Sequence, residues 1–442
     1  MKIKSKVKKW ILIIFITTVA LITVALGGVM YLFHFGVTKR VRLEAADEYF
    51  SREFQNNLVI TENSQWRGDG RNGVYHETDL LKTWRNNTPD LLWTYEGLGN
   101  GYTSAAVANE RLYITGLLGE RVFLFVFDLN GVLLAKKDVC YERTTAYPGP
   151  RSTVCVNDGK LYIYTALGKL HCLDEATLET VWTKYLFEDF DGANIRWGTA
   201  ESPLIVGDKI FMTPGGATHN MVALNKHTGA LIWSASGLGT PSSYCSPQFI
   251  DGYAAPIVVT NTHEHIIAFN ANTGEMLWAH PQKNQRNIHP NTPFYSNGMI
   301  LSTTGYKGGT LMLRLKDGGK AVEQVWKNDA DNQIGGVVKI GDYAYTTGHN
   351  NRGFYCMDWN TGEIKYRVNN HAACAIVAAD GMIYCYSDKG DMLLVKPNPD
   401  RFDVVSRFKI TLGTNEHWAH PVIHHGVMYV RHGDALMAYK IK

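Results

Sequence analysis

Short segments that each precede a strand-like run carry the side chains best suited to binding chemistry. They read GPRSTV, NIRWGTAESP, PSSYCSP, NIHPNTP and NEHWAHP. A guanidinium group binds a carboxylate through paired hydrogen bonds, and aromatic rings stack on planar or cationic groups. These residue types predict a site for an anionic, planar small molecule, provided that the fold brings the segments together. The candidate ligand-binding residues are Arg151, Arg196, Trp197, Glu201, Tyr244, His289, Asn291, His417 and Trp418.

Oxygen ligands for a calcium ion are present, but their spacing does not show that they meet. The candidates are Asp191, Asn194 and Glu201, which are close in sequence, and Asn291, which is far from them. Calcium needs several oxygen atoms around one point. The histidine pair His417 and His420, like the pair His263 and His265, has no evident third ligand. The sequence therefore predicts no metal site.

Other catalytic signatures are absent, and no catalytic residue is assigned. The sequence has no P-loop, no GxSxG elbow and no HExxH motif, so it gives no support for nucleotide hydrolysis, serine hydrolysis or zinc proteolysis. The seven cysteines include no CxxC pair, and most lie in apolar strand-like runs. They are interpreted as small, buried core residues.

The elements that must position the candidate residues form a repeat. Eight two-residue turns, each between two strand-like runs, recur 39 to 49 residues apart. Such turns need positive φ, which Asp-Gly and Asn-Gly adopt at low cost. The turns are Asn109-Glu110, Asp158-Gly159, Gly207-Asp208, Asp251-Gly252, Asn297-Gly298, Gly341-Asp342, Asp380-Gly381 and His425-Gly426. A period near 45 residues with four strands per unit is typical of a β-propeller, so an all-β, eight-bladed β-propeller with four-stranded antiparallel blades is predicted over residues 64–442.

A recurring phrase ends several units and predicts how the blades pack. NKHTGALIW ends at Trp233 and NANTGEMLW ends at Trp278. Threonine and glycine form the turn of the last hairpin, and the large ring on the outermost strand is expected to wedge between neighbouring blades. The predicted docking residues are Trp93, Trp182, Gly229, Trp233, Gly274, Trp278, Trp326 and Tyr366. Since the last unit stops after three strands, residues 91–96 are expected to complete it and close the ring.

This fold would gather the candidate residues on one face. In a propeller, the loops that enter the innermost strands surround the mouth of the central channel, and the candidate residues lie in those loops. Two interpretations stay open. The residues bind a small molecule, or they are polar groups that line a wet channel and cap strand ends. Arg67-Gly68-Asp69 is interpreted as a turn.

The N-terminal segment predicts a membrane anchor. Residues 10–35 are an apolar run longer than the about 20 residues that span a bilayer, and residues 1–9 contain five lysines. We expect a cytoplasmic tail (1–9), an uncleaved single-pass signal anchor (10–35), a linker or short helix (36–63), and a periplasmic propeller. Eight of the 44 basic residues and no acidic residue lie in residues 1–42, so the remainder has 36 basic against 41 acidic residues. This mild acidity argues against nucleic acid as a partner.

The repeat resembles that of the pyrroloquinoline-quinone-like (PQQ-like) β-propeller family, with its tryptophan-docking motif. The full matches are Asn225, Thr228, Gly229 and Trp233, and Asn270, Thr273, Gly274 and Trp278; partial matches are Asp174, Thr177 and Trp182, and Asp358, Thr361 and Gly362. The resemblance covers about residues 66–442, and QWRGDGRNGV is similar to the lead-in of such chains. It implies either a quinoprotein dehydrogenase, which uses the quinone and usually calcium, or a non-catalytic propeller of the outer-membrane β-barrel assembly machinery.

The sequence favours the non-catalytic branch. Many alcohol-oxidising members carry two adjacent cysteines beside the cofactor, and no Cys-Cys pair is present. The main hypothesis is a membrane-anchored binding or scaffold protein of the bacterial envelope whose partners are envelope proteins. The alternative is a PQQ-dependent alcohol or sugar dehydrogenase with PQQ and calcium as cofactors. A third hypothesis, from the aromatic residues at the channel mouth, is a sensor that binds a glycan or another small molecule.

Overall fold

The computed structural model describes residues 49–50, 65–68, 70–142 and 146–442. It contains two compact units, Met1–Tyr49 and Phe50–Lys442, and the two-residue strand β1 (Tyr49–Phe50) lies at their boundary. The predicted anchor, residues 10–35, and nearly all of the predicted linker lie outside the described residues. In the part of the chain that is described, no helix has the length and apolar content needed to cross a bilayer.

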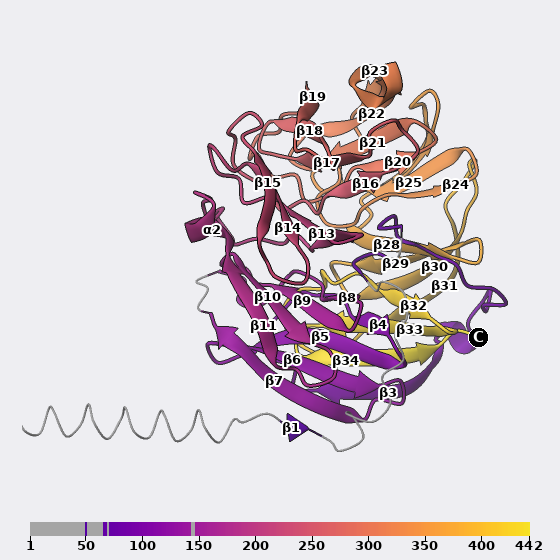
Figure 1. The fold of residues 1–442 in the computed structure, drawn as a ribbon. Helices are drawn as coiled ribbons and strands as arrows, with labels where there is room; N and C mark the ends of the chain where they lie inside the picture. The colour runs from indigo at the N-terminus through magenta and orange to yellow at the C-terminus, as the bar shows by residue number, and fades with distance from the viewer. Residues whose placement is uncertain (1–48, 51–64, 69, 143–145) are drawn as a thin grey trace, which may run out of the picture. The chain divides into compact units, whose positions relative to one another are not determined.

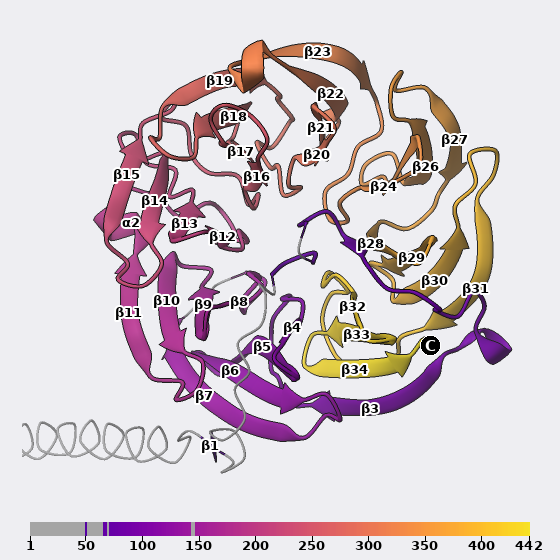
Figure 2. The same ribbon diagram turned by 45° about the vertical axis from the view of Figure 1, so that its right-hand side comes forward.

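The second unit is a ring of eight antiparallel sheets (Figures 1 and 2), which confirms the predicted eight-bladed propeller. Each sheet forms one blade, and the chain visits the blades in order around the ring. Blades one to four contain β4 (Ala106–Ala108), β5 (Arg111–Leu118), β6 (Arg121–Asp128) and β7 (Leu133–Tyr141); β8 (Cys155–Asn157), β9 (Lys160–Tyr164), β10 (Lys169–Asp174) and β11 (Thr180–Tyr185); β12 (Leu204–Val206), β13 (Lys209–Met212), β14 (Met221–Asn225) and β15 (Leu231–Ala235); and β16 (Gln248–Ile250), β17 (Ile257–Asn261), β18 (His265–Asn270) and β19 (Met276–Pro281).

The remaining blades follow the same plan, with the innermost strand first. Blades five to eight contain β20 (Phe294–Ser296), β21 (Met299–Thr304), β22 (Gly309–Lys316) and β23 (Ala321–Asn328); β24 (Val338–Ile340), β25 (Tyr343–Thr347), β26 (Gly353–Asp358) and β27 (Ile364–Asn369); β28 (Cys374–Ala379), β29 (Met382–Ser387), β30 (Asp391–Lys396) and β31 (Asp403–Lys409); and β32 (Val422–His424), β33 (Val427–His432), β34 (Ala435–Lys440) and β3 (Asp90–Glu96). Short helices are η1 (Arg85–Asn87), α2 (Leu186–Asp189) and η2 (Asp317–Gly319). All seven cysteines are free, and six of them are buried.

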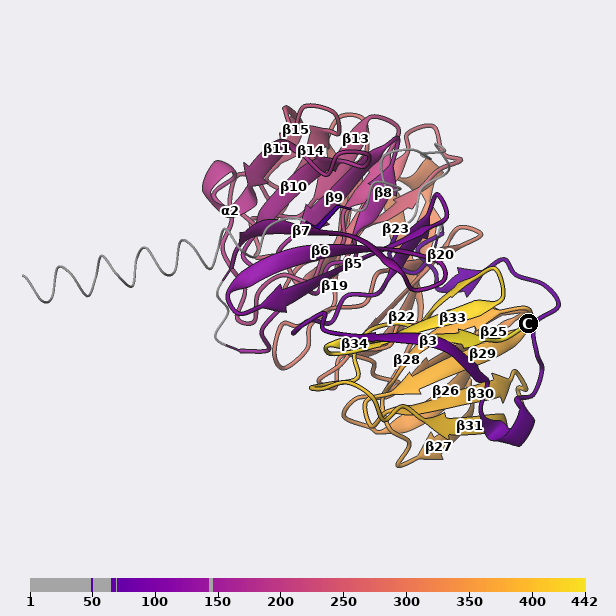
Figure 3. The same cartoon turned by 90° about the horizontal axis from the view of Figure 1, so that it is seen from below.

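The eighth blade takes its outer strand from the beginning of the propeller. Strand β3 pairs antiparallel with β34, with Leu91 opposite Tyr439 and Glu96 opposite Ala435. Figure 3 shows β3, in indigo, beside the yellow strands β33 and β34. Residues 91–96, the segment expected to close the ring, lie within β3. This pairing joins the first part of the propeller to the last and leaves no blade with three strands.

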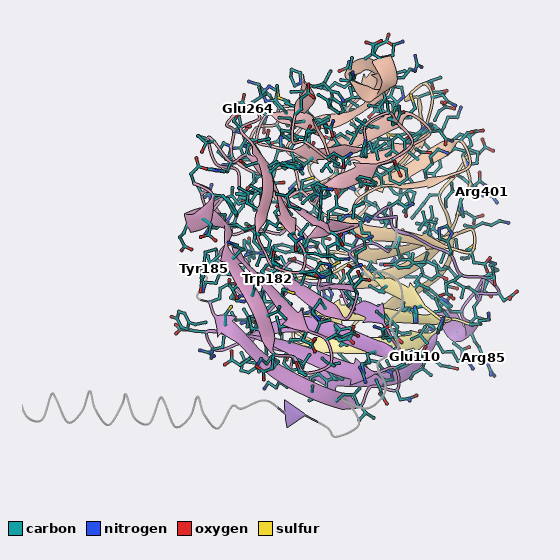
Figure 4. All side chains as sticks on the ribbon, in the orientation of Figure 1. Arg85, Glu110, Trp182, Tyr185, Glu264 and Arg401 are labelled. Atoms are coloured by element: carbon teal, nitrogen blue, oxygen red, sulfur yellow. The ribbon has the colours of Figure 1, made fainter. Side chains whose placement is uncertain are left out.

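Indole rings fasten five of the eight outer strands to the next blade. The Nε1 atom of Trp233 donates to the carbonyl oxygen of Ala271 at 3.1 Å, and Trp182, labelled in Figure 4, donates to Lys226 O at the same distance. Equivalent hydrogen bonds run from Trp93 to Leu129, from Trp278 to Gly319 and from Trp326 to Trp359. Tyr366 has no indole N–H; its ring stacks on Phe354 of its own blade, with centroids 6.4 Å apart, and also packs against the apolar cluster shared with the seventh blade.

The glycine of the docking phrase has two separate requirements. Gly362 has φ 72°, and a Cβ atom placed there would lie 2.4 Å from Cδ2 of Trp326. The residue must therefore both adopt a left-handed conformation and leave room for the ring of the preceding blade. Gly381, in the tight turn between β28 and β29, has φ 73°, but nothing lies within 4 Å of its added Cβ.

These two glycines provide a matched test of the docking contact. We expect Gly362→Ala to lower the free energy of unfolding by about 2 kcal/mol more than Gly381→Ala. Both variants have the same backbone strain, whereas the first also overpacks the indole contact, which costs about 1–3 kcal/mol. Urea denaturation of both variants measures the difference. Equal losses would show that the indole shifts aside without cost.

Candidate functional site

A buried arginine from the lead-in makes hydrogen bonds to three blades near the centre of the ring. Arg67 donates from Nη1 to Ile376 O at 3.1 Å and from Nη2 to Val337 O at 2.8 Å. Its Nη1 also lies 2.9 Å from Nδ1 of His420, which accepts this hydrogen bond. Burial lowers the pKa of Arg67 to about 10. Arg67 thus connects the sixth, seventh and eighth blades, and Gly68 N donates to Gln65 O in the turn around it.

A second buried arginine reaches the other side of the ring. Arg71 donates from Nη2 to Ser202 O and from Nη1 to Pro203 O, both at 2.9 Å, at the entrance of the third blade. Burial lowers its pKa to about 10 as well. Beyond it, the strand β2 (Val74–Tyr75) adds in parallel to β28, and the indigo segment in Figure 2 runs across the middle of the ring. The lead-in therefore crosses the middle of the ring and ties opposite blades together.

A cavity of about 330 Å³ opens next to this segment, at the entry loops. Its wall is mainly aromatic, and we call its ring-bearing part the aromatic bowl. The aromatic bowl consists of Trp66, Tyr102, Tyr147, Trp197, Tyr244, Tyr306 and Trp418. Arg151, Gln333, His349 and His420 are the main polar residues of the same cavity.

The structure brings four of the nine candidate ligand-binding residues into this cavity. They are Arg151, Trp197, Tyr244 and Trp418. Arg196 lies beside it and borders a second cavity of about 240 Å³, where its guanidinium group is 4.9 Å from the ring of Trp197. The structure does not bring the other four candidate residues into either cavity; each of them is held by protein groups.

Glu201 and Asn291 are buried and bound within the ring. Both carboxylate oxygens of Glu201 accept hydrogen bonds from Thr213 N, at 3.0 and 3.2 Å. Burial raises the pKa of Glu201 to about 8, although Thr213 and Arg71 act in the opposite direction. Asn291 donates to Asn332 O at 2.7 Å and accepts from Gly336 N, so it joins the fifth and sixth blades.

His289 and His417 also make protein contacts. The Nε2 atom of His289 is 2.9 Å from His263 O. His417 stacks on His432 with centroids 3.5 Å apart, and its Nδ1 atom lies 2.6 Å from the hydroxyl of Tyr386. Burial lowers the pKa of both His289 and His417 to about 4. Neutral imidazoles in such contacts hold loops in place.

The donor set does not fit a calcium–quinone centre. Asp191 is exposed and binds Thr218 and His219, whereas Glu201 is buried against Thr213. In the described part of the chain, no three His, Cys, Asp or Glu side chains are grouped so as to hold a metal ion. Calcium needs several oxygen atoms around one point, and both of these carboxylates are already held by hydrogen bonds from protein groups.

Several residues of the cavity were not predicted from the sequence, although a sequence pattern marks two of them. Tyr306 and His349 follow the second strands of the fifth and sixth blades, in loops that open on the same face as the entry loops because the strands are antiparallel. Both residues come directly after the tripeptide Thr-Thr-Gly. Tyr102 and Tyr147 lie in loops of the first and second blades outside the quoted entry segments, and Trp66 lies in the lead-in.

The raised pKa of Glu201 predicts a pH effect on stability. The native state keeps a proton on Glu201 up to about pH 8, whereas the unfolded chain loses it near pH 4.5. The native state thus binds more protons than the unfolded state in this window, so stability falls as the pH rises from 4.5 to 8. We expect Glu201→Gln, which cannot ionise, to be more stable than the unchanged protein at pH 9 and similar at pH 5. Thermal melts at both pH values measure this, and an equal effect at both would contradict it.

The comparisons with known proteins identify the repeat. A family model described as outer membrane protein assembly factor BamB matches residues 127–368. The BamB protein of Shewanella oneidensis is 25% identical over 240 residues, which cover 48% of this chain and 55% of that protein. Quinoprotein ethanol dehydrogenase of Pseudomonas aeruginosa is 27% identical over 149 residues, 30% of this chain and 23% of that protein. The matched regions thus span about half, or less, of the length of these relatives.

Solved structures agree on the fold. BamB from Moraxella catarrhalis has a TM-score of 0.56 at 12% identity and covers 80% of this chain and 100% of that one. Quinohemoprotein alcohol dehydrogenase from Comamonas testosteroni has a TM-score of 0.64 at 11% identity, with 88% and 82% covered. The predicted resemblance to PQQ-like propellers is confirmed. Since the family model extends from the first blade to the sixth, more than half of the sequence, the chain belongs to the family of outer membrane protein assembly factor BamB.

Proposed function

We propose that this chain is a binding or scaffold protein of the bacterial envelope, held at the membrane by residues 10–35, with its propeller on the periplasmic side. Its partners in this proposal are envelope proteins, as the name of its relative, an outer membrane assembly factor, suggests. A polypeptide partner binds along the outer strands of neighbouring blades.

The observation that carries the proposal is the apolar surface of the outer strands β11, β15 and β19. Val181 and Tyr185 on β11, Leu231 and Ile232 on β15, and Met276 on β19 are large apolar side chains that are 41–46% exposed. Each strand is the last in its sheet, so it can accept a further strand through its backbone. Figure 4 labels Tyr185 at the periphery of the ring.

The equivalent strand β27 of the sixth blade serves as an internal control. Its exposed side chains include Lys365 and Arg367, which are charged. Charged side chains on an edge strand discourage pairing with another chain. The strands β11, β15 and β19 thus differ from β27, whereas β3 in the eighth blade also exposes apolar side chains, Leu91 and Leu92.

Site-specific photocrosslinking in cells tests this docking surface. A photoreactive residue at Ile232 is expected to give a discrete adduct with an envelope protein, and one at Arg367 is expected to give none. The double variant Leu231→Glu, Ile232→Glu should remove an adduct formed from Met276 while leaving the melting temperature unchanged. Absence of adducts from Val181, Ile232 and Met276 alike would reject the proposal.

The alternative of a PQQ-dependent alcohol or sugar dehydrogenase rests on likeness to the Pseudomonas aeruginosa enzyme over 30% of the chain. The hydrogen bonds that already hold Asp191, Glu201 and Asn291 to protein groups count against it. Titrating the purified chain with PQQ, with and without calcium, and then adding alcohols and sugars tests this reading. Turnover of any of these substrates would overturn the scaffold proposal.

A further inference from the structure

We propose that the aromatic bowl, together with the second cavity beside it, binds a saccharide that carries a carboxylate. This site lies at the channel mouth, and the proposed docking surface lies on the outer strands. It is therefore an additional function that does not depend on the scaffold role. Four independent features support it: wall shape, unused hydrogen-bonding groups, backbone conformation and charge.

The wall of the aromatic bowl is curved. The rings of Tyr102 and Trp418 are 5.0 Å apart at 37°, and those of Tyr147 and Trp418 are 5.0 Å apart at 47°. Trp197 and Tyr244 are 6.3 Å apart, also at 37°. A flat quinone would be held best between two parallel surfaces. A puckered pyranose ring presents C–H groups in several directions and so fits rings that are tilted to one another.

The wall also offers hydrogen-bonding groups that the protein does not use. Among the described residues, Nη1 of Arg151 and Oε1 of Gln333 have no hydrogen-bond partner, although both atoms are buried. The Nε2 atom of Gln333 donates to the hydroxyl of Tyr306 at 3.0 Å, so that hydroxyl still has its own proton to donate. Sugar hydroxyls both donate and accept, so they satisfy such a set, whereas an aliphatic ligand would leave it unpaired.

Three tyrosines of the aromatic bowl have an unfavourable backbone conformation. The φ angles are 50° for Tyr147, 65° for Tyr244 and 52° for Tyr306. Bulky residues rarely adopt positive φ, and such residues cluster at ligand-binding sites where the surrounding structure holds them in place. Their common place in one cavity indicates that the rings are fixed for binding before the ligand arrives.

The charge of the two cavities selects an anion. The second cavity shares Trp197 and Tyr244 with the first, and it adds Arg196, Arg286 and His263. Among the residues that the structure describes, no Asp or Glu lines either cavity, although acidic residues outnumber basic ones beyond residue 42. A sugar ring in the aromatic bowl would place a carboxylate substituent next to these guanidinium groups, which bind carboxylates through paired hydrogen bonds.

A matched pair of ligands tests the proposal. The full-length chain, purified in a polyoxyethylene detergent that contains no sugar, is titrated with trigalacturonate and with its neutral methyl ester. Tryptophan fluorescence and calorimetry follow binding. We expect saturable binding of the acid and at least a tenfold weaker affinity for the ester, because the ester keeps the sugar rings and loses the charge. A hyaluronan tetrasaccharide, which carries glucuronate, is a second acidic probe.

Variants separate the two parts of the site. Trp418→Ala should abolish binding of both ligands, and Arg286→Gln should lower the affinity for the acid to that for the ester. Arg85→Gln, at the periphery in Figure 4, should change nothing, and the melting temperatures show that all variants remain folded.

Several results would overturn the proposal. These are failure of both acidic probes to bind, equal affinity for acid and ester, or unchanged binding by Trp418→Ala. Preferential binding of a short peptide with an aromatic and a glutamate residue would assign the cavity to polypeptides instead. Since these measurements use the isolated chain and different variants, they leave the crosslinking test of the outer strands unaffected.

Discussion

Arg67→Ala is expected to lower the free energy of unfolding by at least about 3 kcal/mol, because a hydrogen bond to a charged group contributes about 1.5–3 kcal/mol. The variant removes the donor for Ile376 O and Val337 O and the partner of His420. These acceptors are enclosed in the ring, so water cannot replace the guanidinium group without a rearrangement of the lead-in. Urea denaturation monitored by tryptophan fluorescence measures the loss.

Two further variants show whether the loss belongs to the guanidinium group. Arg85→Ala removes an exposed arginine from η1 and should change stability by less than about 0.5 kcal/mol. Arg67→Lys keeps the charge, but a single ammonium group cannot reach acceptors on three blades, so an intermediate loss is expected. If Arg67→Ala were as stable as Arg85→Ala, the lead-in would contribute nothing to the ring.

His420 is expected to lower the stability of the protein in mild acid, and Glu201 acts in the opposite direction above about pH 4.5. His420 is buried, and its burial together with the adjacent Arg67 lowers its pKa to about 3. Its Nδ1 atom accepts from Arg67, and its Nε2 atom donates to Ile334 O at 3.1 Å, so the native ring is neutral. An unfolded histidine has a pKa near 6.5. Between about pH 6.5 and pH 3 the unfolded chain binds a proton that the native protein lacks.

The resulting slope can be measured. Stability should fall with decreasing pH in that window, by up to about 1.4 kcal/mol per pH unit from His420 alone. The groups that face its ring are Arg67, Trp66 and the carbonyl of Ile334, and none of them is acidic. Urea denaturation between pH 4 and pH 6 should give a slope for His420→Gln that is smaller by about one proton. The exposed His227→Gln serves as the control and should keep the original slope; an unchanged slope in both would show that His420 does not control acid stability.

The blades could be predicted from sequence because their signals are local. Each Asp-Gly or Asn-Gly turn and each Thr-Gly phrase specifies a hairpin within a few residues, and the period then gives the number of blades. The docking phrase also predicts that the indole ring lies between the outer strand and the next blade. Tyr366 has no indole N–H to donate, but its ring contacts Phe354 and the apolar cluster shared by the sixth and seventh blades.

The candidate site was only partly predictable, for a physical reason. The entry loops could be found from the strands that follow them, and they gave Arg151, Trp197, Tyr244 and Trp418. Arg67 and Trp66 could not be found in this way, because their partners lie far along the chain: Arg67 contacts groups 268 to 353 residues away. No local sequence pattern predicts that the lead-in segment crosses the centre of the ring. The functions suggested for Glu201 and Asn291 depended on convergence, which spacing alone does not show.

The closing pair of β3 and β34 has a consequence for how the chain is made. Leu91 is synthesised long before its partner Tyr439, so the early strand must wait unpaired until all the strands between them have been made. Contacts of such high sequence separation slow folding, and unpaired strand edges invite association with other chains. If synthesis stopped, or the chain were cut, before β34, the blades made up to that point would keep their sequences. The ring would stay open because β3 would have no partner. A polypeptide that lacks β34 would therefore keep β3 as a free edge, which chaperones and proteases can recognise.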